Sequence, residues 1–128
     1  MSTPEYKTSF KIRLAAADAH YANQLVDGAK ILEFFGDAAT ELLILKDGDE
    51  GFFRAYESVE FLHPVRAGDF IEVSAQIIRV GNSSRQMEFF AHKIIAAKPT
   101  ELQPHAAEVL PTPILCVKAV GTCVVVKS

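Results

Sequence analysis

The segment from Leu25 to Leu45 is too apolar for an ordinary surface helix, yet four of its charged residues fall in a single file. At 100° per residue, Lys30, Glu33, Asp37 and Glu41 lie within about 80° of arc, and apolar side chains cover most of the remaining circumference. A helix with so much apolar surface must be covered by other elements. The segment therefore predicts one long, mostly buried helix with a narrow charged stripe.

Two carboxylates of this stripe, Asp37 and Glu41, are one helical turn apart. A like-charged pair at this spacing costs roughly a few tenths of a kcal/mol on an exposed helix, and more where water is excluded. Two interpretations stay open. The stripe faces solvent, as polar stripes of helices packed on sheets normally do, or it faces a cationic ligand.

Size and charge limit the classes of protein that this chain can belong to. Its 128 residues, 49% of them hydrophobic, suit one domain spanning residues 1–128. A formal net charge of -3 argues against a nucleic-acid or anionic-membrane surface. The N-terminus lacks the apolar core of a signal peptide, and no segment approaches the roughly 18 apolar residues that span a bilayer. We expect a soluble, cytoplasmic protein.

The remaining segments show the two-residue period of strands. Turn residues at Pro64, Gly68-Asp69 and Gly81-Asn82 join three of them into an expected antiparallel meander. Four of the six prolines fall within residues 98–113, which predicts a rigid connection without regular structure. Strands are expected at residues 7–14, 52–61, 70–80, 85–97 and 114–127.

The predicted order is strand, long helix, then four strands, and this order favours an α+β fold. A five-stranded antiparallel sheet must wrap around the one central helix to cover its apolar circumference, which is the hotdog arrangement. Such a sheet keeps an open edge. Pairing of two subunits into a continuous sheet would cover that edge, so we expect a homodimer or a higher homo-oligomer of dimers.

The cysteines and histidines give no sign of a disulfide or a metal site. Cys116 and Cys123 are seven residues apart on one predicted strand, too far apart for a disulfide at about 3.3 Å per residue. We expect both to be reduced, buried thiols. The four histidines are too scattered for a zinc site.

Polar side chains gather in the loop before the helix, where unpaired backbone N–H groups favour a developing negative charge. His20 and Tyr21 belong to this loop, and Gly28 at the helix start permits close approach of a ligand. A thioester or enolate oxygen could bind there. Equally, Asp18 or Asn23 could merely cap the chain, His20 could be an incidental loop histidine and Tyr21 could pack.

A second polar group lies in the expected turn after the third strand. The turn brings backbone N–H groups, hydroxyls and a guanidinium together, as a phosphate site requires, although an ordinary solvent-facing hairpin explains the same residues. The turn consists of Gly81, Asn82, Ser83, Ser84 and Arg85.

Several segments together resemble the hotdog-fold coenzyme A ammonia lyases. VEFLHPVRAGDFIEV and RVGNSS are shared broadly with hotdog acyl-CoA thioesterases, whereas DAHY, LVDGAKI and GDAATEL form the more specific signature. The resemblance covers roughly residues 7–126 apart from the proline-rich connection. It implies a carbon–nitrogen lyase that reversibly eliminates ammonia from a 3-aminoacyl-CoA thioester, with 3-aminobutyryl-CoA giving crotonyl-CoA in lysine fermentation. It implies no cofactor besides the coenzyme A of the substrate.

The implied reaction needs a base for the proton next to the carbonyl, donors for the enolate oxygen, and a partner for the cationic amine. Asp37 and Glu41 would supply base and ammonium ligand, with their division of roles left open. Backbone N–H groups near Asp27 and Gly28 would bind the oxyanion, and His20 and Tyr21 would complete the pocket from the facing subunit. The resemblance implies that coenzyme A runs along Arg66 and the turn from Gly81 to Arg85.

Two alternatives remain from other classes. Many hotdog thioesterases start this helix with a Gly-Gly pair and carry one acidic residue after it, whereas this chain has Asp27-Gly28 and two carboxylates. That difference disfavours acyl-CoA hydrolysis without excluding it, because a carboxylate can also activate water. A non-catalytic acyl-CoA-binding subunit would have a solvated stripe. A β-alanyl substrate also stays open, since one methyl group is worth only about 1 to 3 kcal/mol in a pocket.

Overall fold

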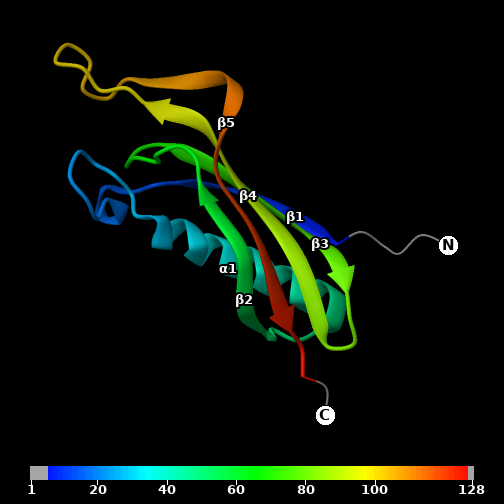
Figure 1. The fold of residues 1–128 in the computed structure, drawn as a ribbon. Helices are drawn as coiled ribbons and strands as arrows, with labels where there is room; N and C mark the ends of the chain where they lie inside the picture. The colour runs from blue at the N-terminus through cyan, green and yellow to red at the C-terminus, as the bar shows by residue number, and fades with distance from the viewer. Residues whose placement is uncertain (1–5, 127–128) are drawn as a thin grey trace.

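The computed structural model describes residues 6–126, which form one long helix and a five-stranded sheet (Figure 1). Every strand pairing is antiparallel. The elements in chain order are β1 (Lys7–Arg13), the 3-10 turn η1 (Ala16–Asp18), α1 (Gly28–Asp47), β2 (Phe52–Phe61), β3 (Phe70–Val80), β4 (Ser84–Ala97) and β5 (Ala107–Val124). The predicted α+β hotdog fold is confirmed.

Helix α1 lies across the concave face of the sheet and supplies a third of the buried core residues (Figure 1). The aromatic rings of Phe35 from α1 and Phe89 from β4 stack with centroids 5.2 Å apart, and both are fully buried. The buried helix positions follow the 3.6-residue period of the sequence. They are Ile31, Phe34, Phe35, Ala38, Ala39, Leu42 and Leu43.

The strand order, β1-β3-β4-β5-β2, differs from the expected meander. The expectation that residues 52–61 pair with residues 70–80 is wrong, because β2 pairs with β5 at the far edge of the sheet. The connection between β2 and β3 packs beside the start of the helix instead of making a hairpin. Val26 donates a backbone hydrogen bond of 2.9 Å to the Val65 carbonyl, and Leu25 bridges Arg66. Strands β1 and β2 form the two edges.

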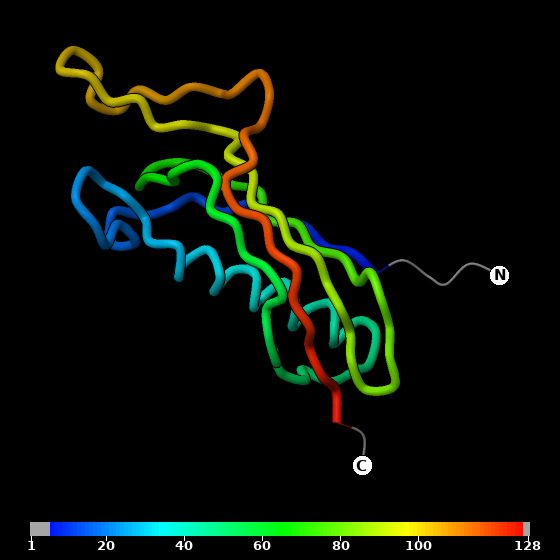
Figure 2. The backbone as a smooth tube through the Cα atoms, viewed as in Figure 1, coloured from blue at the N-terminus to red at the C-terminus, as the bar shows by residue number. Residues whose placement is uncertain are grey.

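Strand β5 begins earlier than expected, because the hairpin of β4 and β5 continues beyond the helix as a two-stranded arm (Figure 2). Residues 107–113 are therefore part of a strand, not of an irregular connection. Ile95 pairs with Val109 and Lys93 with Ile114, so an unpaired bulge separates the two pairings. Pro111 and Pro113, which cannot donate ladder hydrogen bonds, fall inside or next to this bulge.

The helix ends two residues later than the apolar pattern suggests. Gly48 adopts a left-handed conformation with φ of 67° and donates its N–H to the Ile44 carbonyl at 2.9 Å. A glycine in this position is a common helix terminator because it carries no Cβ. Within residues 6–126, no helix is long and apolar enough to cross a membrane.

Candidate active site

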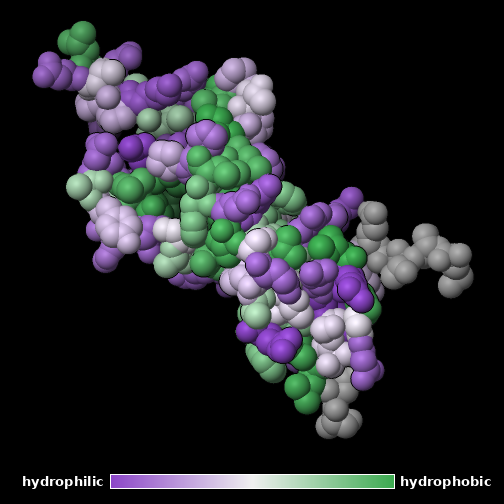
Figure 3. Space-filling view, in the orientation of Figure 1, coloured by the Kyte–Doolittle hydropathy of each residue, from purple (hydrophilic) through white to green (hydrophobic). Residues whose placement is uncertain are grey.

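A pocket of about 360 Å³ opens where the start of α1 meets the end of β2. Figure 3 shows hydrophobic side chains inside a hollow at this end of the molecule, below the β4–β5 arm. Only two of the lining side chains, those of Tyr21 and His63, carry polar atoms. The pocket is lined by Tyr21, Leu25, Val26, Gly28, Ile31, Phe61, Leu62, His63, Pro64, Val65 and Val117.

The start of α1 forms one wall of this pocket, and its first residue, Gly28, lies close against the Phe61 ring. A Cβ atom on Gly28 would lie 2.4 Å from Cε1 of Phe61, closer than any real contact. Asp27, the N-cap residue, makes no side-chain capping hydrogen bond. The first N–H groups of a helix have no intrahelical acceptor. The helix start therefore brings uncapped donors and a positive dipole end to the pocket wall.

The loop before α1 places Tyr21 in the pocket and His20 beside it. The two rings meet edge-on with centroids 5.0 Å apart, but His20 is exposed and does not line the pocket. Tyr21 is fixed by a backbone hydrogen bond of 3.1 Å to the Leu25 carbonyl. Asn23 and Gln24 both have φ near 60°, a conformation that costs energy in residues other than glycine. This strain is concentrated in the turn that presents Tyr21.

The predicted acidic pair lies outside the pocket of the same protomer. Asp37 and Glu41 are both exposed on α1, and neither lines a described cavity. Glu41 accepts a hydrogen bond of 2.5 Å from the Thr8 hydroxyl on β1. Lys30 and Glu33 of the same stripe form an ion pair at 3.5 Å. Within one protomer Asp37 and Glu41 face solvent, so the alternative of a cationic ligand for the stripe requires a second subunit.

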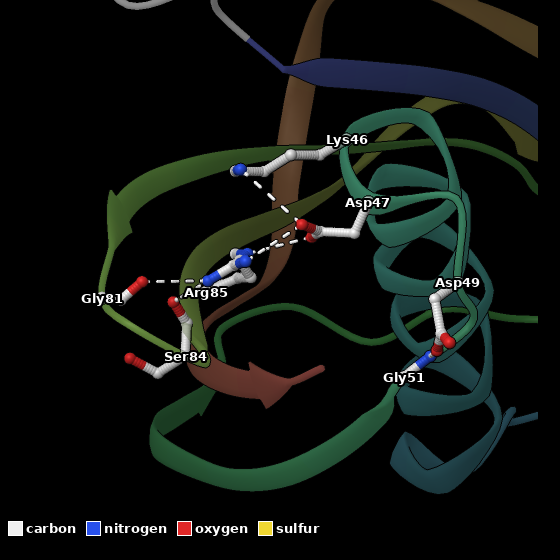
Figure 4. A network of polar contacts seen from close by, with 7 residues as sticks. All are labelled: Lys46, Asp47, Asp49, Gly51, Gly81, Ser84 and Arg85. Carbon is white, nitrogen blue, oxygen red and sulfur yellow. Dashed lines mark hydrogen bonds and ion pairs between the residues drawn. The ribbon is translucent and has the colours of Figure 1, made fainter. Parts of the chain in front are cut away.

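The predicted coenzyme A turn lies at the opposite end of the protomer from the pocket. A helix of this length extends for about 30 Å, and the turn packs against its C-terminal end (Figure 4). Gly81, Asn82 and Ser83 are exposed there. Arg85 is not, because its guanidinium is buried and binds Asp47, the Gly81 carbonyl and the Ser84 carbonyl.

Arg85 is therefore not free to bind a phosphate, in contrast to the expectation from the sequence. A guanidinium has five N–H donors, and four hydrogen bonds within the protein already use it. Hydrogen bonding to Asp47 raises the pKa of Arg85 above its ordinary value. Arg85 therefore stabilises the packing of this turn against the end of α1.

Arg66 lies next to the pocket wall, on the connection between β2 and β3. Its backbone N–H donates a bond of 2.8 Å to the buried carboxylate of Asp69. Asp69 also accepts the N–H of Ala97 at 2.9 Å and forms an ion pair with Lys93 at 3.2 Å. Lys93 in turn donates to the Pro64 carbonyl. This network, which the sequence did not reveal, fixes the pocket wall to the base of the arm.

His63 is the polar pocket residue that sequence reasoning missed. Its ring nitrogen Nδ1 lies 3.1 Å from the Leu115 carbonyl oxygen, and its backbone N–H donates to the Cys116 carbonyl at 3.2 Å. Cys116 is the extra residue of a β-bulge, because Ala91 pairs with Val117 while the next residue of β4 pairs with Leu115. The one available signal was a histidine directly after a strand, which is too common to single out.

Comparison with known proteins places the chain in a family. The family model of the thioesterase superfamily matches residues 23–94. A 3-aminobutyryl-CoA ammonia lyase from Acetoanaerobium sticklandii is 55% identical over 122 residues, which cover 95% of this chain and 96% of the relative. The chain belongs to the ammonia lyase family of the thioesterase superfamily.

Solved structures agree with this membership. The β-alanyl-CoA:ammonia lyase from Clostridium propionicum superposes with a TM-score of 0.88 at 38% identity, covering 93% of this chain and 84% of that one. A hexameric acyl-CoA thioesterase superposes with a TM-score of 0.74 at 16% identity, covering 95% of this chain and 70% of that one. The second likeness shows the hotdog fold alone. The ammonia lyases thus match nearly the whole chain.

Proposed function

We propose that this protein is a 3-aminobutyryl-CoA ammonia lyase, a carbon–nitrogen lyase that reversibly converts 3-aminobutyryl-CoA into crotonyl-CoA and ammonia. The observation that carries the proposal is the 55% identity with an enzyme of that name over almost the full length of both chains. The pocket at the start of α1 supports it, because it combines an apolar lining with uncapped backbone donors. The acyl-CoA substrate brings its own coenzyme A, and no further cofactor is proposed.

The helix start supplies the electrostatic part of the proposed reaction. Removal of the proton next to the thioester carbonyl moves negative charge onto the carbonyl oxygen, and donors aimed at that oxygen lower the barrier. Backbone N–H groups at Gly28 and Ala29 are suited to this task because they have no intrahelical acceptor and no capping side chain. We place the thioester of the substrate against these groups, with Tyr21 on the opposite side.

The acidic pair takes part in this proposal only across a subunit contact. Asp37 and Glu41 face solvent in one protomer, so a second protomer must cover them before they can bind the substrate ammonium in a neighbouring pocket. Two open sheet edges, β1 and β2, offer unpaired backbone groups for such an assembly. We propose a homodimer, in which His20 also reaches the pocket of the facing subunit.

The same assembly is required for the proposed coenzyme A contacts. Arg66 lies at the pocket end of the protomer and the exposed residues Gly81 to Ser83 at the other. One extended ligand meets both only if they come from different subunits. The place of the enzyme in lysine fermentation and its cytoplasmic location stay predictions.

The substrate assignment is tested by comparing two thioesters. With purified protein, ammonia release from 3-aminobutyryl-CoA and from β-alanyl-CoA is measured, and kcat/KM is compared. We expect a preference for 3-aminobutyryl-CoA of roughly 10- to 100-fold, the usual contribution of one methyl group in an apolar pocket. A preference for β-alanyl-CoA would contradict the substrate assignment but keep the reaction class. Absence of ammonia release from both would contradict the lyase activity itself.

A further inference from the structure

We propose that His63, through its ring nitrogen Nε2, is the base that removes the proton next to the thioester carbonyl. This inference rests on the lyase reaction proposed above and assigns one of its steps to a residue of the pocket. The acidic pair, which the sequence suggested for this step, lies outside the pocket of its own protomer. It then keeps the role of binding the ammonium group.

The hydrogen bond of Nδ1 determines which nitrogen of His63 can accept a proton. The Leu115 carbonyl can only accept a hydrogen bond, so Nδ1, which lies 3.1 Å from it, must carry the proton. In the neutral ring, Nε2 is then the unprotonated nitrogen with an available lone pair. Within residues 6–126, no side chain or backbone group forms a hydrogen bond with Nε2.

The backbone around His63 is fixed, as a catalytic group requires. Leu62 and His63 both donate their N–H groups to the Cys116 carbonyl, at 2.7 Å and 3.2 Å. The β-bulge at Cys116 breaks the regular pairing of β4 with β5 at this point. Three hydrogen bonds thus hold residues 62–63 on β5 and orient the imidazole ring.

Among the side chains that one protomer contributes to the pocket, His63 is the one suited to accept a proton. The other polar side chain of the lining belongs to Tyr21, and a tyrosine hydroxyl is protonated near neutral pH. An imidazole is the side chain that most often acts as a general base. Phe61, two residues before His63, touches Gly28 at the helix start. His63 and the helix start that carries the oxyanion donors therefore line the same pocket, and Phe61 lies beside both.

The step balances without a further reactant. Nε2 takes the proton from the carbon next to the carbonyl, the electrons of that C–H bond form the new carbon–carbon double bond, and the carbon–nitrogen bond breaks. The ammonium group leaves as neutral ammonia, and its positive charge is balanced by the imidazolium that forms. In the reverse direction, ammonia adds to crotonyl-CoA and the imidazolium returns the proton.

The first test compares His63→Asn with His105→Asn. The asparagine amide can still donate to the Leu115 carbonyl but cannot take the proton, and His105 lies at the exposed tip of the arm. We expect His63→Asn to lower kcat for ammonia release by about 10²- to 10⁴-fold, with KM and the urea unfolding midpoint little changed. His105→Asn should match the wild type. A kcat of His63→Asn within threefold of wild type would overturn the inference and keep the lyase activity.

The second test measures proton removal separately from cleavage of the carbon–nitrogen bond. Butyryl-CoA has no amino group, so exchange of its α-protons for deuterium in D2O, followed by mass spectrometry, reports the base alone. We expect exchange with wild type, with Asp37→Asn and with Glu41→Gln, and loss of exchange with His63→Asn. Exchange that survives in His63→Asn, or is absent from the wild type, would overturn the assignment. Failure of the lyase reaction itself would instead appear as absence of ammonia release.

Discussion

The guanidinium of Arg85 and the carboxylate of Asp47 meet through two hydrogen bonds of 2.9 Å inside one end of the protomer. Only 2% and 5% of these side chains are exposed. The pair joins the last residue of α1 to the second residue of β4, and Lys46 adds a further ion pair at 3.7 Å (Figure 4). The turn predicted to bind a phosphate is thus fastened to the helix by its own arginine.

Removal of the carboxylate should destabilise the fold strongly. Asp47→Asn leaves the Arg85 charge buried without its counter-ion, and breaking a buried pair costs about 3 to 5 kcal/mol. Lys98→Gln provides the control, because the Lys98–Glu108 pair is exposed and such pairs contribute about 1 kcal/mol or less. Urea unfolding measures both free energies. Equal effects of the two substitutions would show that Arg85 does not depend on Asp47.

Alanine at Gly28 should lower activity, whereas alanine at Gly36 should stabilise the helix. Gly28→Ala places a Cβ against the Phe61 ring and displaces the pocket wall, so we expect kcat/KM to fall roughly 10- to 100-fold. Gly36→Ala meets nothing within 4 Å. It should leave activity unchanged and stabilise the helix by about 0.5 to 1 kcal/mol. Activity assays and thermal unfolding check both, and full activity of Gly28→Ala would contradict the placement of the site.

We expect Asp37 and Glu41 to bind the ammonium group of the substrate. Asp37→Asn and Glu41→Gln remove charge at nearly constant volume, and each should lose most of its activity while the fold survives. A hydrogen bond to a charged group contributes about 1.5 to 3 kcal/mol, so the KM for ammonium in the addition direction should rise on the order of tenfold or more. Glu33→Gln, on the same stripe, is the matched control. Full turnover by both variants would mean that the stripe only faces solvent.

Assembly is predicted because the acidic pair and the pocket do not meet in one protomer. Light scattering coupled to size-exclusion chromatography should report twice the mass of the chain, or a multiple of that dimer, at every concentration with measurable activity. An active monomer would contradict both the dimer and the proposed role of Asp37 and Glu41.

The two cysteines should be unreactive in the folded protein. Burial raises the pKa of Cys123 from 9.0 to about 12, and it raises the pKa of Cys116 as well. A thiol reagent should therefore label both only after unfolding. Because the unfolded thiol ionises at lower pH than the folded one, the free energy of unfolding should fall as pH rises from about 9 toward about 12. Rapid labelling of native protein at neutral pH would contradict this burial.

Local pattern was enough to predict the elements, but not which strands become neighbours. The apolar period of residues 25–45 and the alternation of residues 52–61 concern neighbouring residues, and both predicted elements were found within a few residues. The pairing of β2 with β5 depends on contacts between distant segments, such as the bond from Val26 to Val65. The same limit explains the arm, where a bulge accommodates prolines that looked like breakers.

In the candidate site, too, the sequence pointed only to residues that carry a local signal. Tyr21 and Gly28, which line the pocket, could be proposed from the sequence because a polar loop before a helix and a glycine at its start are local signals. His63 was missed because its importance comes from the Leu115 carbonyl, fifty-two residues away along the chain. Arg85 was assigned to a ligand because its partner Asp47, thirty-eight residues away, was not visible in the turn itself.

The most direct measurement follows wild-type protein with crotonyl-CoA and ammonium, recording the absorbance of the conjugated thioester together with free thiol. The proposed lyase should remove the absorbance in proportion to ammonium while releasing no thiol. Thiol release in step with the absorbance loss would identify a hydrolase, no change in either signal would identify a binding subunit, and either result would contradict ammonia addition by this protein.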